Sequence, residues 1–312
     1  MLANFIIIGA PKAGTTALYW YLAEHPQVFM SPVKETNYFA YGRDDAGRLV
    51  YGDPKIHHFP VRSESEYEDL FENAGNASAI GEASPMYLEC PASAARIRDR
   101  IPDAKIICAL RNPVDRAWSD YLMYLRQSGR RFDAARDLAP DAPWMQPDSH
   151  WVRVSHYHDA LRRYFDRFPR EQVHVFLFDD LRQDPRRVVQ EVYRFLGVDA
   201  SYVPDFDTPY NTGGLPANRL LERVFNLQAL KHAVEPLLPR RAMNRLRQLR
   251  ASNLRKPPAL PAELRAQLGA HFRDDIHKTA ELIKMPLDAW LEPVHEGRIP
   301  AASVASTSLG SH

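Results

Sequence analysis

Short apolar segments rich in β-branched residues alternate along the chain with longer segments whose apolar residues recur at helical spacing. The short segments cover residues 2–8, 28–30, 77–81, 105–110 and 173–178. Runs of this kind, apolar on both faces, are typical of strands buried in a parallel sheet. The segments between them are long enough to hold the helical crossovers that parallel strands require.

Helices are predicted over residues 15–22, 92–100, 113–126, 155–167, 185–196 and 261–283. Ser63 and Glu66 form a capping-box pattern that opens a further helix, and Gly197 is placed to end the helix over 185–196. Residues 128–150 are polar and contain proline, so we expect a loop or partial lid there. The elements together predict an α/β fold, a parallel sheet with helices on both faces and a mainly helical C-terminal portion.

The length of the chain allows one large α/β domain or two small ones. The chain has 312 residues, of which 45% are hydrophobic and 25% charged, as is usual for a globular protein. We expect a single domain over residues 1–295, with a core over 1–200 and a helical part over 201–295. Residues 296–312 are small and polar, which predicts a disordered tail. The apolar N-terminal stretch is too short to span a bilayer, so no transmembrane segment is expected.

The net charge and the cysteine and histidine residues limit which binding partners, disulfides and metal sites are expected. The net charge is +1, so no overall field favours nucleic acid, and the binding electrostatics must be local. Cys90 and Cys108 cannot make a disulfide framework, and Cys108 lies in an apolar run typical of a buried free thiol. Such thiols fit a reducing cytoplasm. His156 and His158 would point to different faces of a helix, so no metal site is expected.

The most informative segment is Gly9-Ala-Pro-Lys-Ala-Gly-Thr-Thr16, between a predicted strand and a predicted helix. Loop amides and a helix N-terminus together favour an anion there. The glycines have the spacing of a P-loop, but Thr15 follows Gly14 and the only lysine, Lys12, lies inside the loop. A P-loop NTPase needs the lysine after the second glycine and an acidic magnesium ligand. The nearest candidate for that acid, Asp179, comes late in the chain.

Three motifs in order resemble those of sulfotransferases that use 3′-phosphoadenosine 5′-phosphosulfate (PAPS). Pro11-Lys-Ala-Gly-Thr-Thr16 is similar to the 5′-phosphosulfate loop of that family, and Leu110-Arg-Asn-Pro-Val-Asp-Arg-Ala-Trp-Ser119 to its 3′-phosphate segment. Val33-Lys-Glu-Thr-Asn-Tyr-Phe39 resembles an element of the heparan-sulfate, N-sulfotransferase-type branch. Weaker matches begin at Gly81 and Asp184. The resemblance covers residues 4–200 and is to a bacterial member with a P-loop-like sheet.

The resemblance implies transfer of a sulfuryl group from PAPS to a hydroxyl or amine of a small-molecule, glycan or carrier-bound acceptor, leaving 3′,5′-adenosine bisphosphate (PAP). It implies that Lys12 stabilises the leaving oxygen and that Glu35 is the general base. The expected cofactor contacts are Pro11, Lys12, Ala13, Gly14, Thr15, Thr16, Arg111, Ser119, Gly213 and Arg219. Lys34 and Ser84 are the expected acceptor contacts. No metal is expected, because a sulfuryl group carries less charge than a phosphoryl group. Residues 201–295 would cover the cofactor.

Two other functions stay open, a P-loop kinase or other NTPase and a catalytically silent nucleotide-binding module. The lack of a lysine after Gly14 argues against the first, and the pair of Lys12 and Glu35 argues against the second.

Several positions bear on the acceptor and on further contacts. Ala83 and Ala160 stand where some relatives that act on polysaccharides carry lysine and histidine, which argues against a heparan-like acceptor. Arg116 is either a further phosphate contact or part of a solvated helix face. The basic segment 231–256 either contacts a membrane or an acidic substrate or, as the favoured alternative, is a solvated helix at the edge of the acceptor cleft. The sequence leaves the acceptor and the oligomeric state open.

Overall fold

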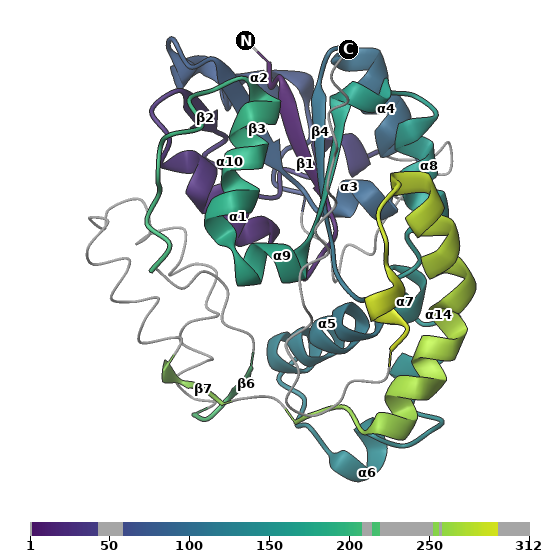
Figure 1. Ribbon diagram of the computed structural model, residues 1–312. Helices are drawn as coiled ribbons and strands as arrows, with labels where there is room; N and C mark the ends of the chain where they lie inside the picture. The colour runs from purple at the N-terminus through teal and green to yellow at the C-terminus, as the bar shows by residue number, and fades with distance from the viewer. Residues whose placement is uncertain (1, 43–58, 208–213, 219–251, 256–257, 293–312) are drawn as a thin grey trace.

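A five-stranded parallel sheet forms the centre of the computed structural model (Figure 1). Its strands are β1 (Phe5–Gly9), β2 (Val28–Met30), β3 (Ala79–Ala83), β4 (Lys105–Leu110) and β5 (Val173–Leu177). Their spatial order is β2-β3-β1-β4-β5, and all neighbouring strands are parallel. A separate antiparallel pair joins β6 (Leu215–Pro216) to β7 (Leu254–Arg255). The structure describes residues 2–42, 59–207, 214–218, 252–255 and 258–292.

The described helices divide between the two faces of the sheet and its carboxyl edge. They are α1 (Thr15–Ala23), α2 (Glu64–Asp69), α3 (Met86–Glu89), α4 (Ser93–Arg100), α5 (Pro113–Gln127), α6 (Ala134–Asp137), α7 (His150–Arg153), α8 (His158–Phe165), α9 (Phe178–Gln183), α10 (Pro185–Leu196) and α14 (Ala262–Ile283). One face of the sheet contacts α1 and α10, and α3, α4 and α8 cluster at the other (Figure 1). The long α14 packs along α8 and α5.

Strand β1 is the middle of the core. All five of its residues are buried, and it pairs with β3 on one side and β4 on the other. The chain leaves β1 toward β2 but leaves β3 toward β4, which lies on the opposite side of β1. Open α/β sheets bind ligands outside the carboxyl ends of strands where the connections diverge in this way. The topology therefore indicates a site at the carboxyl ends of β1, β3 and β4.

Helix α14 is tied to α5 by polar contacts as well as by apolar packing. The guanidinium of Arg265 pairs with the carboxylate of Asp115 at the start of α5. The indole of Trp118 donates a hydrogen bond of 3.2 Å to the carbonyl oxygen of Pro258, just before α14. These contacts hold the C-terminal helix against the element that follows β4.

The predicted fold is confirmed, and several boundaries match closely. The strand over 105–110 and the helix over 185–196 are β4 and α10, and Gly197 ends α10 with φ 81°. The predicted capping box forms at the start of α2, where Ser63 and Glu66 satisfy each other's backbone amides.

Two expectations need correction. The segment over 128–150 is not an open loop, because it contains α6 and a 3-10 turn at Pro143–Met145 whose Trp144 is fully buried. The strand expected over 173–178 ends at Leu177, because Phe178 already opens α9.

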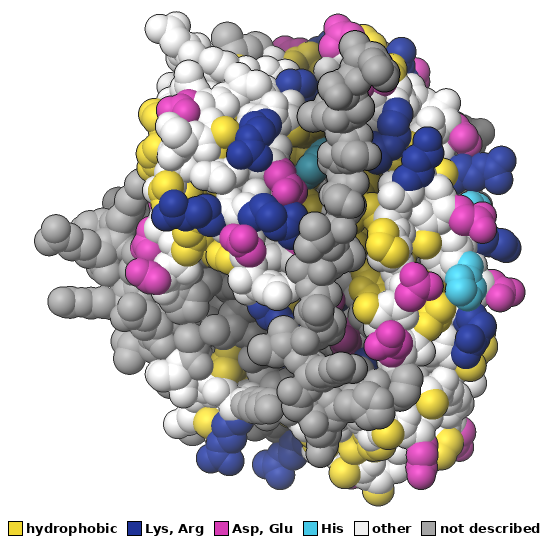
Figure 2. Space-filling view, viewed as in Figure 1, with side chains coloured by type: hydrophobic (Ala, Val, Ile, Leu, Met, Phe, Trp, Pro, Cys, Tyr) yellow, Lys and Arg dark blue, Asp and Glu magenta, His cyan; other side chains and the backbone are white. Residues whose placement is uncertain are grey.

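Some expectations lie outside the described residues, namely those for Gly213, Arg219, most of segment 231–256 and the tail from 296. The assignment of residues 1–295 to one domain stays a prediction. Among the described helices, none has the length and apolar character of a membrane span. Figure 2 shows Lys and Arg side chains interspersed with Asp and Glu on the visible face, in keeping with the net charge of +1.

Candidate active site

The loops that leave the carboxyl ends of the strands bring together the two proposed phosphate-binding segments, residues 11–16 and 110–119. The glycine-containing loop follows β1 and ends at Gly14, where α1 begins. Arg111 follows β4 directly, and Phe178 follows β5. Because parallel strands end at the same edge of a sheet, residues far apart in the sequence meet here.

Gly14 shapes the phosphate loop in two ways. Its φ of 91° lies in the left-handed region that favours glycine. A Cβ atom at this position would lie 2.9 Å from Leu181 and 3.0 Å from Phe178, so the backbone also needs the absence of a side chain. Gly14 has no side chain to cap α1, and the first-turn amides of a helix have no intrahelical acceptor. Those amides, beginning with buried Thr15 and half-buried Thr16, suit an anionic group.

Lys12 lies in the same loop with an unusual backbone and a weak side-chain partner. Its φ is 66°, and its Nζ lies 3.3 Å from the thioether sulfur of Met123 on α5. Burial lowers the pKa of Lys12 to about 8, the negative charges of Asp120 and, less strongly, Glu35 oppose that lowering, and the positive charges of Arg126 and Arg111 add to it. A thioether is a weak acceptor, so the ammonium loses little in exchanging it for an oxyanion.

Arg111 contacts the loop itself. Its guanidinium donates a hydrogen bond of 3.1 Å to the carbonyl oxygen of Lys12 and lies 4.8 Å from the ring centre of Phe178. The hydroxyl of Tyr157 donates to the carbonyl oxygen of Arg111 at 2.9 Å, which fixes the backbone. Stacking on an aromatic face leaves the edge of the guanidinium available for a phosphate.

Helix α5 carries the rest of the second motif. Ser119 is half-buried there, whereas the solvated helix face expected as one alternative for Arg116 is wrong because that side chain is fully buried. Its Nε donates to Ser155 at 2.7 Å and its second amino group to the carbonyl oxygen of Trp151 at 2.7 Å, while Asp120 lies 3.4 Å away. Arg116 therefore anchors α5 to the segment around α7.

Glu35 lies on the loop that follows β2 and adopts a left-handed φ of 63°. Its amide donates to the carbonyl oxygen of Ala83 at the end of β3, at 2.9 Å. The ammonium of Lys34 lies 2.6 Å from its Oε1. The side chain of Glu35 is 53% exposed and that of Lys34 19%, so the carboxylate is open to solvent. Strained backbone of this kind often occurs at functional positions.

Ser84 lies beneath this loop and is fully buried. Its hydroxyl donates to the carboxylate of Glu82 at 2.8 Å and accepts from the amide of Asn37 at 3.1 Å. Glu82 was missed by the sequence reasoning, although a single acidic residue within the apolar strand Ala79–Ala83 was a signal of a buried polar site. The expected acceptor contact at Ser84 is, in the structure, a support of the loop.

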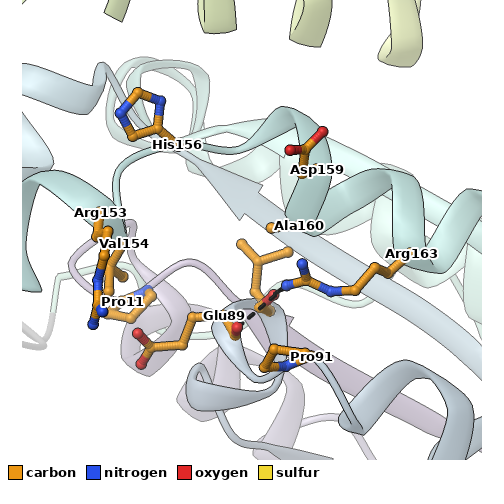
Figure 3. Close-up of a pocket in the computed structure, with 10 residues that line it drawn as sticks. Pro11, Glu89, Pro91, Arg153, Val154, His156, Asp159, Ala160 and Arg163 are labelled. Atoms are coloured by element: carbon orange, nitrogen blue, oxygen red, sulfur yellow. Dashed lines mark hydrogen bonds between the residues drawn. The ribbon is translucent and has the colours of Figure 1, made fainter. Parts of the chain in front are cut away.

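A cavity of about 300 Å³ opens beside the phosphate loop (Figure 3). Pro11 forms one side and the small side chain of Ala160 on α8 forms another. Its lining is completed by Leu88, Glu89, Pro91, Arg153, Val154, His156, Asp159 and Arg163. Arg163 donates to the carbonyl oxygens of Leu88 at 2.9 Å and Glu89 at 3.2 Å, so its guanidinium is hydrogen-bonded to the backbone that forms the cavity wall.

Titratable side chains elsewhere in the described segments do not gather as a metal site would require. No group of three or more His, Cys, Asp or Glu residues there could hold a metal ion. Asp179 lies in the first turn of α9, where it pairs with Arg182 at 3.8 Å, and burial raises its pKa. Cys90 and Cys108 are buried free thiols.

Comparison with known proteins identifies the family. A profile described as "Sulfotransferase family" matches residues 4–202, which include both loops and Arg111. The chain belongs to the sulfotransferase family. A sulfotransferase crystal structure from Alicyclobacillus acidocaldarius is 30% identical, with a TM-score of 0.66 over 94% of this chain and 100% of that one.

Curated relatives include enzymes of heparan sulfate synthesis. The mouse bifunctional heparan sulfate N-deacetylase/N-sulfotransferase 3 is 26% identical over 93% of this chain and 31% of its own length. The human heparan sulfate glucosamine 3-O-sulfotransferase 3B1 is 28% identical over 79% of this chain and 60% of its own length. The sulfotransferase thus spans about a third of the first of these relatives, and its whole activity has to be argued from its own residues.

Proposed function

We propose that the protein transfers a sulfuryl group from PAPS to a hydroxyl or amine of an acceptor, without a metal ion. The observation that carries the proposal is the meeting of Lys12, Glu35 and Arg111 at one edge of the sheet. Lys12 is a loop cation whose side chain, within the described residues, hydrogen-bonds to a weak acceptor, the thioether of Met123, and the charge of Glu35 favours its protonated form. Arg111 is hydrogen-bonded to the same loop.

The described residues fit the two phosphate groups of PAPS. The loop from Pro11 to Thr16 would hold the 5′-phosphosulfate through its amides, and Gly14 leaves the space that this approach needs. Arg111 and Ser119 would bind the 3′-phosphate, since a guanidinium matches two phosphate oxygens at once. Gly213 and Arg219 remain proposed as contacts from the later part of the chain.

PAPS supplies a sulfuryl group on an anhydride whose leaving group is a phosphate. The protonated Lys12 would stabilise the bridging oxygen as the bond to sulfur breaks and negative charge grows there. Glu35 would take the proton from the acceptor oxygen or nitrogen as it attacks sulfur. Lys34, 2.6 Å from Glu35, would orient that carboxylate and face the acceptor.

The acceptor would enter through the cavity beside Pro11. The space next to Ala160 lies against the phosphate loop, and its mixed apolar and polar lining suits a small organic group. The absence of lysine at Ala83 and of histidine at Ala160 favours an acceptor other than a heparan-like chain. The buried thiols favour a reducing compartment, and we propose that it is the cytoplasm.

An acceptor screen tests the proposal. The protein is incubated with PAPS and EDTA together with amines, phenols, alcohols and sugars, and PAP and sulfated products are followed by mass spectrometry. We expect PAP formation that persists in EDTA and is lost in Lys12→Met. Transfer of phosphate from Mg·ATP instead would favour the kinase alternative. PAP binding without any turnover would favour the silent module.

A further inference from the structure

A buried carboxylate lies directly beneath the loop that carries Glu35. Glu82 on β3 is fully buried, and within the described part of the chain it forms no ion pair with a lysine, arginine or histidine. A buried carboxylate without a cation is costly unless hydrogen bonds replace its hydration. Glu82 therefore needs donors from several parts of the chain.

Four buried hydroxyl groups supply these hydrogen bonds. Oε2 of Glu82 accepts from Thr36 at 2.6 Å and Ser84 at 2.8 Å. Oε1 accepts from Tyr87 at 2.9 Å and Tyr67 at 3.1 Å. The four hydroxyls and the carboxylate form what we call the Glu82 cluster.

Because the protons of these hydroxyls are directed at Glu82, their oxygens are left to accept hydrogen bonds. Three of them accept from backbone amides of the loop over residues 35–40, and the longest of these bonds runs from the amide of Tyr38 to Thr36 at 3.4 Å. Ser84 accepts from the amide of Asn37 at 3.1 Å, and Tyr87 accepts from the amide of Phe39 at 3.3 Å. The carboxylate thus orients the hydroxyls of Ser84 and Tyr87 so that both accept from the loop, and the hydroxyl of Thr36 also lies 2.9 Å from that of Tyr87.

The loop needs such support because its backbone is strained. Glu35 and Asn37 both have left-handed φ values, 63° and 53°, which are uncommon for residues other than glycine. Thr36 stands between them and is fully buried, with its hydroxyl on Glu82. The residue that fixes Thr36 therefore also fixes the direction in which Glu35 leaves the backbone.

We propose that Glu82 is a positioning residue for sulfuryl transfer, which acts through Thr36, Ser84 and Tyr87 to hold the loop that carries Glu35 in place. The inference rests on the proposed role of Glu35 as the base. A base displaced by about 1 Å loses up to about 100-fold in rate. Glu82 itself touches neither PAPS nor acceptor.

Variants of the hydroxyls test this better than Glu82→Gln, which reverses the hydrogen bonds of a buried group and risks misfolding. Thr36→Val removes the hydroxyl at constant shape, and Thr36→Ser keeps it. Tyr87→Phe and Tyr67→Phe delete the same group from the same oxygen of Glu82, but of these two hydroxyls only that of Tyr87 accepts a hydrogen bond from a backbone amide of the loop. The ring of Tyr67 packs on Tyr38 and Phe39, and phenylalanine keeps that contact. Tyr67→Phe is therefore the matched control.

The rate of PAPS hydrolysis, with water as acceptor, and hydrogen exchange of the amides of residues 35–40 are measured for each variant. We expect Thr36→Val and Tyr87→Phe to lower kcat about 10- to 100-fold, with the KM for PAPS and the affinity for PAP within about threefold of wild type. Their loop amides should exchange at least about tenfold faster. Thr36→Ser and Tyr67→Phe should keep kcat within about threefold, although Tyr67→Phe lowers the melting temperature.

Equal losses of kcat in Tyr67→Phe and Tyr87→Phe would overturn the inference, because the cluster would then act only through stability. Unchanged loop exchange in Thr36→Val would overturn it as well. Full activity of Thr36→Val together with loss of activity in Glu35→Gln would overturn the role of Glu82 and leave the proposed function intact. Full activity of Glu35→Gln would remove the proposed base and this inference with it.

Discussion

The guanidinium of Arg111 donates a hydrogen bond of 3.1 Å to the carbonyl oxygen of Lys12. The two residues are 99 positions apart in the chain, yet they meet because β4 pairs directly with β1. The contact links the loop proposed for the 5′-phosphosulfate to the side chain proposed for the 3′-phosphate. One ligand with phosphates at both ends of a nucleoside would engage both at once.

Replacement of Arg111 should weaken PAP binding far more than binding of 5′-AMP, which lacks the 3′-phosphate. Arg111→Ala removes charge-assisted hydrogen bonds worth about 1.5–3 kcal/mol, so we expect the Kd of PAP to rise about 10- to 150-fold. Arg111→Lys keeps the charge but loses the planar fork, and it should recover only part of the affinity. Calorimetric titration measures both. An equal loss for PAP and 5′-AMP would show that Arg111 acts only by holding the loop.

Lys12 should make PAP binding depend on pH. Its pKa is lowered to about 8 in the ligand-free protein, and a bound phosphate raises it by favouring the charged form. PAP therefore binds tightest below about pH 8, and its affinity should fall by up to about tenfold per unit as the pH rises beyond that value. Titrations between about pH 7 and 9.5 measure the slope. Lys12→Met should bind weakly with little pH dependence, and a flat wild-type profile would refute the assignment.

Glu35→Gln should slow sulfuryl transfer without affecting the cofactor. Loss of a general base costs about 10²- to 10⁴-fold in kcat, whereas the Kd of PAP should stay within about twofold. Glu64→Gln is the matched control, because Glu64 also forms a 2.6 Å ion pair with a cation, Arg100, and is similarly exposed at 59%. Steady-state kinetics measure kcat for both variants, and only Glu35→Gln should lower it. Equal activities of both variants would reduce the pair of Lys34 and Glu35 to an ordinary surface ion pair.

Ala160→Phe should impair use of the acceptor by filling the cavity beside Pro11. With the acceptor that screening identifies, we expect kcat/KM to fall about tenfold or more while PAP affinity is unchanged. Ala160→Ser barely alters the volume and should behave like wild type. An unaltered kcat/KM in Ala160→Phe would place the acceptor elsewhere.

The sequence predicted the sheet and the two phosphate motifs because both depend on local patterns. The apolar run over 105–110 is β4, and glycine spacing located the loop before Gly14. The bond between Arg111 and Lys12 was not predictable, since it depends on β1 lying between β3 and β4. Strand order is a property of long-range packing that periodicity does not encode.

The Glu82 cluster and the segment over 128–150 show a second limit of prediction from the sequence. The hydroxyls around Glu82 come from positions up to 46 residues away from it, so each one alone resembles an ordinary polar residue. Polar composition favoured a loop over 128–150, but Trp144 stacks on Tyr121 with centroids 5.1 Å apart and at 13°. The aromatic residue was the informative signal, because large rings add apolar area that outweighs nearby polar side chains.

Calorimetric titration of the wild-type protein with PAP, 5′-AMP and Mg·ATP tests the central claim most directly. The PAP and 5′-AMP titrations are run with EDTA. If Arg111, Lys12 and the Gly14 loop form a PAPS site, PAP binds at least about 10-fold more tightly than 5′-AMP, with no metal, and more tightly than Mg·ATP. Tighter binding of Mg·ATP, or equal binding of PAP and 5′-AMP, would contradict the account.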